Sequence, residues 1–147
     1  CYIFRLENLA NQPMIRVEHI GIAVKDLRAS IPVFEKVLNA DCYKTEKVEG
    51  EAVNTAFFRQ GETKIELLES ISENGVIAKH IEKRGEGLHH IAFEVEDIYA
   101  EMQRLKAEGF VLLNETPKQG ADNKLVCFLH PKSTNGVLIE LCMDKKP

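Results

Sequence analysis

Two histidines and two glutamates occupy matching positions in two similar halves of the chain. His19 opens the segment His-Ile-Gly-Ile-Ala-Val, and His90 opens the segment His-Ile-Ala-Phe-Glu-Val at an offset of 71 residues. Glu66 and Glu140 each lie between an isoleucine and a leucine, at an offset of 74 residues. Imidazole and carboxylate together favour zinc, cobalt, nickel, manganese or iron over calcium. This pattern predicts a metal site to which both halves contribute.

Each of these residues alone has a more ordinary interpretation. A strand histidine is more often a hydrogen-bonded core or edge residue than a metal ligand, and a strand glutamate usually faces solvent. The repeat changes this balance, because chance would have to place the same residue types twice. A carboxylate on an otherwise apolar strand is also costly to bury unless it pairs or binds a cation. The repeated pairs therefore favour a metal site.

The internal repeat also fixes the elements that must position these residues. Alternating apolar residues predict strands, and apolar residues at helical spacing predict helices. In the first half, Asp26 is expected to cap a helix that ends near Asn39. The predicted strands of this half cover residues 15–24, 41–48, 53–59 and 64–69, with an acidic loop after the second. The first half, about residues 14–70, is thus predicted to be β-α-β-β-β.

The second half, about residues 88–147, repeats this order after a connection at about 71–87. The connection is predicted to hold a short helix, 76–83. In the second half, Asp97 is expected to cap a helix that stops at Gly109. The predicted strands cover residues 88–95, 110–114, 124–130 and 137–143, and residues 115–123 are expected to form a loop.

Strand alternation predicts which histidines share a face. His19 and Gly21 should point the same way, because side chains alternate along a strand. His89 has the parity of Glu18, so it is expected to face the opposite side, and it is given no metal role. Two further histidines have no repeat partner and are expected at the surface or in turns: His80 and His130.

Composition excludes several classes of function. The chain is 44% hydrophobic and 29% charged, which is typical of a globular protein with a real core. Its net charge of −4 argues against nucleic-acid binding, which depends on a basic surface. No apolar run approaches the roughly 20 residues that span a bilayer. Four cysteines without a C-x-x-C pair indicate reduced thiols and a cytoplasmic protein.

The first thirteen residues do not fit the repeat. They show no clean periodicity, whereas Met14 opens a well-patterned strand. We therefore expect Met14 to be the natural start and residues 1–13 to be an upstream or non-native extension. Residues 14–147 are expected to form a single domain.

Longer segments around these residues resemble a known family. They are His19-Ile-Gly-Ile-Ala-Val, Lys64-Ile-Glu-Leu-Leu-Glu, Gly87-Leu-His-His-Ile-Ala-Phe, Phe128-Leu-His-Pro-Lys-Ser and Gly136-Val-Leu-Ile-Glu-Leu. The chain resembles the vicinal oxygen chelate (glyoxalase/bleomycin resistance) superfamily and, within it, the methylmalonyl-CoA epimerase family. The resemblance covers about residues 14–143. It implies an α+β fold in which two tandem βαβββ modules form a curved, partly open mixed barrel around a metal site, with helices outside.

The resemblance also implies a ligand set and a reaction. His19, Glu66, His90 and Glu140 would hold one divalent ion per chain, of cobalt, zinc, nickel or manganese; some relatives carry glutamine where Glu66 stands. The reaction would interconvert the C2 epimers of methylmalonyl-CoA through a metal-stabilised enolate. Inversion requires acid/base groups on both faces of C2. Glu140 would supply one of them.

The second acid/base group is not evident. In some relatives it is a glutamate in the strand after the acidic loop, but this chain reads Ala-Val-Asn-Thr-Ala at 52–56. Glu51 is the candidate, with Glu49 beside it, although loop glutamates are more often surface charge. Lys132 and Lys118 are candidates for the anionic acyl-CoA substrate. The expected assembly is a homodimer, since an open half-barrel leaves a sheet edge to cover.

Two other functions are compatible with this scaffold. A glyoxalase I-type lyase would use a similar His/Glu/His/Glu set and would also move a proton through an enolate-like state. A non-catalytic small-molecule-binding resistance protein could dispense with the metal. The Leu-His-His and His-Pro-Lys segments favour the epimerase, and four apparent ligands argue against a metal-free protein.

Overall fold

The computed structural model describes residues 14–146. The expected extension, residues 1–13, lies outside the described residues. Within them, Cys42, Cys127 and Cys142 are all free thiols. No helix in this part of the chain is long and apolar enough to cross a membrane.

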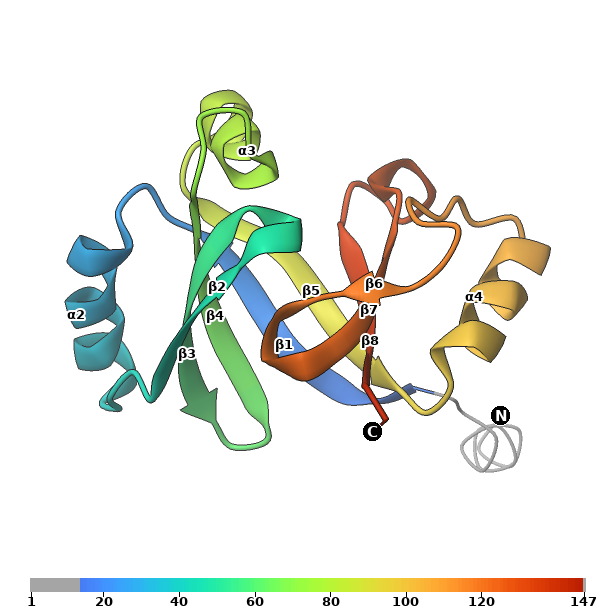
Figure 1. The fold of residues 1–147 in the computed structure, drawn as a ribbon, viewed down its shortest axis with the longest axis horizontal. Coiled ribbons are helices and arrows are strands. Elements are labelled where there is room, and N and C mark those ends of the chain that lie inside the picture. Colours follow the sequence, from blue (N-terminus) through green and yellow to red (C-terminus); the bar gives the residue numbers. More distant parts are fainter. Residues whose placement is uncertain (1–13, 147) are drawn as a thin grey trace.

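One curled sheet of eight strands organises the molecule (Figure 1). The strands of the first module are β1 (Met14–Ala23), β2 (Lys44–Val48), β3 (Val53–Gln60) and β4 (Thr63–Ser70). Those of the second are β5 (Gly87–Val95), β6 (Lys118–Gln119), β7 (Lys124–Leu129) and β8 (Ile139–Asp144). Three 3-10 turns, at Glu49–Glu51, Ala121–Asn123 and Pro131–Ser133, connect them.

The strand order shows the duplication directly. It runs β2-β3-β4-β1-β5-β8-β7-β6, so the two modules meet where β1 pairs antiparallel with β5. In each module the first and last strands pair in parallel, β1 with β4 and β5 with β8. All other pairs are antiparallel, so the sheet is mixed. This confirms the predicted α+β architecture of two βαβββ modules in a partly open barrel.

Helices cover the outside of each module (Figure 1). Helix α2 (Leu27–Leu38) contacts β3 and β4, and α4 (Ile98–Ala107) contacts β7 and β8. Both begin at the predicted aspartate caps, Asp26 and Asp97. Helix α3 (Val76–Arg84) contacts β4 and β1 at one end of the sheet. Apolar side chains between helices and strands form the cores that hold the sheet in its curved shape.

The strand predicted over residues 110–114 is wrong. Only a single bridge forms there, between Leu112 and Leu129, and the edge resumes as β6 at Lys118–Gln119, inside the predicted loop. The Oδ1 atom of Asn114 accepts the backbone N–H of Phe128 at 2.9 Å, in place of a ladder carbonyl. Pro117 has no N–H to donate. The Asn114 side chain and Pro117 thus interrupt the edge strand.

The Asp97 cap gives a stability prediction. Its Oδ1 accepts the backbone N–H groups of Tyr99 and Ala100 at 3.1 and 3.2 Å, at the start of the helix that buries Ile98. We expect Asp97→Ala to lower the free energy of unfolding by about 1 kcal/mol, because these donors lose their partner. Urea denaturation measures this. Glu96→Ala, at an exposed neighbour, should change stability by less than about 0.5 kcal/mol; equal losses would contradict the cap's role.

Candidate active site

Two β-bulges decide which side chains reach the interior of the half-barrel. Where β1 pairs with β5, Glu18 is the extra residue on one strand and His89 the extra residue on the other. Each bulge turns two consecutive side chains to the same face. Glu18, His19, His89 and His90 therefore all line one cavity of about 300 Å³. The prediction that His89 and Glu18 face away is wrong, because strand alternation fails at a bulge.

The structure brings three of the four predicted ligands into one cluster. The Nε2 atoms of His19 and His90 lie 2.9 Å apart. Glu140 places its carboxylate oxygens 3.4 Å from His19 Nε2 and 3.5 Å from His90 Nε2. Glu66 lies on the other side of the His19 ring, 3.0 Å from Nδ1. His19, His90 and Glu140 thus form one candidate metal cluster, and Glu66 forms a second with Glu18 and the other ring nitrogen of His19.

Burial and charge fit this donor set to a divalent cation. Glu140 is 5% exposed, and its Oε2 atom has no hydrogen-bond partner. Burial raises the pKa of Glu140 to about 8. Burial alone would lower the pKa of His19, but the carboxylates of Glu140, Glu66 and Glu18 raise it to about 9. A bound cation would favour the ionised carboxylate and the neutral imidazole over these protonated forms.

A glycine makes room for the second imidazole. Gly21 is the register partner of His90 on β5 and of Glu66 on β4, so it lies between two of the predicted ligands. A Cβ atom at this position would overlap the His90 ring. The site therefore needs a residue without a side chain at position 21, which the strand pattern predicts to face the same way as His19.

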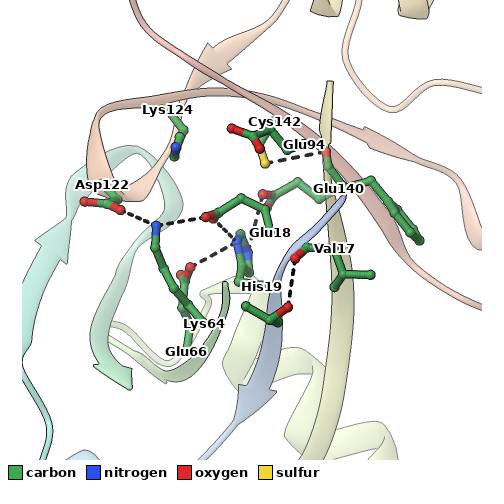
Figure 2. A network of polar contacts seen from close by, with 12 residues as sticks. Val17, Glu18, His19, Lys64, Glu66, Glu94, Asp122, Lys124, Glu140 and Cys142 are labelled. Atoms are coloured by element: carbon green, nitrogen blue, oxygen red, sulfur yellow. Dashed lines mark hydrogen bonds and ion pairs between the residues drawn. The ribbon is translucent and has the colours of Figure 1, made fainter. Parts of the chain in front are cut away.

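A buried chain of charges extends from His19 toward the second module (Figure 2). Glu18 Oε1 lies 2.9 Å from His19 Nδ1, and Glu18 Oε2 forms an ion pair with Lys64 Nζ at 2.9 Å. Lys64 also pairs with Asp122. Burial would raise the pKa of Glu18, but the bonds to His19 and Lys64 lower it to about 2. Glu18 is thus ionised at neutral pH beside the candidate metal cluster.

One part of the cavity wall carries a carboxylate outside the predicted ligand set. Glu51 lines the cavity, and its Oε1 atom lies 3.0 Å from Nζ of Lys118, another lining residue. Thr55 is fully buried in the same wall, and its hydroxyl has no hydrogen-bond partner. It belongs to the segment 52–56, where the sequence has no carboxylate. The structure therefore places Glu51 and Lys118 at the cavity.

Lys132 lies apart from this group. It is exposed in the 3-10 turn Pro131–Ser133 and does not line the cavity. A second hollow, of about 550 Å³, adjoins the cavity through His89, His90 and Leu138. Pro131, next to Lys132, and Arg84 line this hollow.

Sequence reasoning missed the polar residues around the ligands. Glu18 and His89 each precede a ligand histidine at the same repeat offset, which is the signal that could have indicated twin bulges. Lys64 and Lys124 are both buried, at 7% exposure each, and Lys124 also lines the cavity. Their sequence positions alone carry no such signal. Lys124 pairs with the exposed Asp144.

Comparison with known proteins shows which family the chain belongs to. Residues 18–128 match the model of the glyoxalase/bleomycin resistance protein/dioxygenase superfamily. The chain is 40% identical over 132 residues to the uncharacterized protein YqjC of Bacillus subtilis, covering 90% of this chain and 94% of that protein. It is 43% identical over 128 residues to the ethylmalonyl-CoA/methylmalonyl-CoA epimerase of Cereibacter sphaeroides, covering 86% of this chain and 96% of that protein.

A solved structure agrees with this assignment. A variant of the Streptomyces coelicolor methylmalonyl-CoA epimerase, in complex with 2-nitronate-propionyl-CoA, superposes with a TM-score of 0.85 at 32% identity. The match covers 90% of this chain and 99% of that one. The chain therefore belongs to the glyoxalase/bleomycin resistance protein/dioxygenase superfamily and, within it, to the methylmalonyl-CoA epimerase family of isomerases.

Proposed function

We propose that the protein interconverts the C2 epimers of methylmalonyl-CoA. The observation that carries this proposal is the buried Glu140 carboxylate beside two imidazole nitrogens, in a cavity that Glu51 also lines. Relatives that are named as epimerases of this substrate match nearly the whole chain. C2 lies between a thioester and a carboxylate, so its proton can be removed once the resulting charge is stabilised.

His19, His90 and Glu140, with Glu66 adjoining, would hold one divalent ion. A cation bound there supplies Lewis-acid stabilisation of the negative charge that develops on the thioester oxygen. Glu140 would take the proton from C2 on one face, since its carboxylate lines the cavity beside the two imidazoles. The apolar remainder of the cavity, including Val53, excludes water from the carbanion.

Glu51 is the proposed acid/base group for the opposite face. Its side chain is 22% exposed at the cavity wall, and Lys118 holds its carboxylate in place. Lys118 is a cation for the substrate's carboxylate or its CoA portion. We assign the CoA moiety to the adjoining hollow, which is lined by Arg84 and by Pro131, the neighbour of Lys132.

Isotope exchange tests this function. The protein, loaded with cobalt(II), is incubated with methylmalonyl-CoA in deuterated water, and we expect deuterium at C2 together with epimerisation. Isomerisation of the glutathione hemithioacetal without C2 exchange would instead assign a glyoxalase I-type lyase. Binding of small molecules without metal or turnover would assign a resistance-type protein. The homodimer and the cytoplasmic location remain predictions, and light scattering measures the former.

The role of Glu51 gives a sharper prediction. With two acid/base groups, each should remove the proton of one epimer, so Glu51→Gln should lower the rate of inversion by about 10²–10⁴-fold. Deuterium exchange with retention should persist for the epimer whose proton faces Glu140. NMR of each separate epimer in deuterated water measures both rates.

A matched control lies two residues away. Glu49 is 81% exposed and pairs with Lys47, so Glu49→Gln should leave both rates unchanged. If Glu51→Gln inverts C2 at the wild-type rate, the second group is another residue.

A further inference from the structure

Lys64 lies at the centre of a chain of charges that joins the two modules (Figure 2). It is a β4 residue, and its ammonium contacts Glu18 on β1 and Asp122 in the turn before β7. Its side chain is only 9% exposed, and that of Glu18 is 1% exposed. Buried charges of this kind persist only where each is paired. Besides Lys64 and His19, one other cationic side chain lies near Glu18 in the described part of the chain. It is Arg16, whose Nη2 atom is 4.0 Å from Glu18 Oε2.

The contact between Glu18 and His19 determines which ring nitrogen is free. Glu18 accepts from Nδ1 of His19, which leaves Nε2 directed at His90 and Glu140. In metal sites, a carboxylate behind the ligand histidine fixes the tautomer and the orientation of the ring in this way. Glu66 also lies 3.0 Å from Nδ1. With Glu18 on Nδ1, Glu66 is free to turn toward a cation.

Asp122 holds Lys64 from the opposite module. It takes a left-handed backbone conformation, with φ of 55°, and its carboxylate binds Lys44 at 2.6 Å as well as Lys64. Its backbone N–H donates to Glu46 at 3.1 Å. The two residues before it, Gly120 and Ala121, line the cavity. Lys64 thus connects a segment of the cavity wall to the anion that orients His19.

We propose that Lys64 is a positioning residue for the metal centre, which it serves by anchoring Glu18 against Nδ1 of His19. This inference rests on the metal site of the proposed function. It does not depend on the identity of the substrate. It distinguishes Lys64 from Lys44, which binds the same aspartate from β2 and has no contact with Glu18 among those described.

The test compares Lys64→Met with Lys44→Met. Each substitution removes one lysine from Asp122, but only the first removes the partner of Glu18. Metal-free protein is titrated with cobalt(II), and the visible absorption of the bound ion reports both affinity and ligand geometry. We expect Lys64→Met to weaken cobalt binding by about 10–100-fold and to alter the spectrum. Lys44→Met should keep the wild-type affinity and spectrum.

Two results would overturn the inference: wild-type cobalt affinity and spectrum in Lys64→Met, or an equal loss in Lys44→Met. If Lys64→Met does not fold, as circular dichroism would reveal, Glu18→Gln replaces it. The amide still accepts from His19 but lacks the charge that Lys64 anchors, so cobalt affinity should fall in the same direction, and an unchanged affinity would refute the proposal. Because metal alone is the probe, absence of epimerase activity in the wild type would refute the proposed function and leave this test intact.

Discussion

Replacing Glu140 with glutamine is expected to lower the rate of C2 inversion by at least about 10³-fold, because in the proposed mechanism this side chain serves as both base and ligand. The amide cannot accept the C2 proton, and it removes the negative charge from the cluster of His19 and His90. Deuterium incorporation into each epimer of methylmalonyl-CoA, measured by NMR, gives the rate. Exchange from the epimer whose proton faces Glu140 should disappear.

Two measurements separate the roles of base and ligand. Metal content after gel filtration shows whether Glu140→Gln still holds cobalt(II), and inversion measured at saturating cobalt shows the effect on proton transfer alone. The control is Glu94→Gln, because Glu94 is a β5 glutamate that pairs with Arg16 and does not line the cavity. Wild-type exchange in Glu140→Gln at full metal occupancy would mean that another group is the base.

The duplication explains why so much of the fold could be predicted. Matching apolar alternation around His19 and His90 located the two central strands, and each aspartate that follows caps a helix as expected. The repeated glutamates then indicated a candidate ligand set, of which three members meet directly and Glu66 lies beside them. Patterns that occur in both halves thus predicted the two modules and the residues at the centre of the candidate site.

The residues that surround the ligands could not be predicted in the same way. A bulge is a property of paired strands, so the directions of Glu18 and His89 depend on a register that a single strand does not reveal. Lys64 and Asp122 meet only after the modules fold together, 58 residues apart in sequence. The repeat also contains no counterpart for Glu51, whose place at the cavity depends on its contact with Lys118.

Gly21→Ala is expected to disrupt the metal centre more than any other single-methyl change. The new Cβ would overlap the His90 ring, and both lie on paired central strands that cannot separate without breaking the β1–β5 ladder. The ring must therefore rotate away from His19 and Glu140. We expect cobalt(II) affinity to fall by about 100-fold or more, at the upper end of losses from disturbed ligand orientation. Isothermal titration of metal-free protein measures it.

Gly50→Ala is the matched control. A Cβ there would make only ordinary contact, 3.9 Å from the carbonyl oxygen of Gln119. It should retain wild-type cobalt affinity. The overlap at Gly21 also predicts lower stability, since overpacking a buried site costs about 1–3 kcal/mol. If Gly21→Ala bound cobalt normally while losing stability, the ring would have found a second position that still reaches the metal. That result would show that His90 does not need the orientation that the glycine allows.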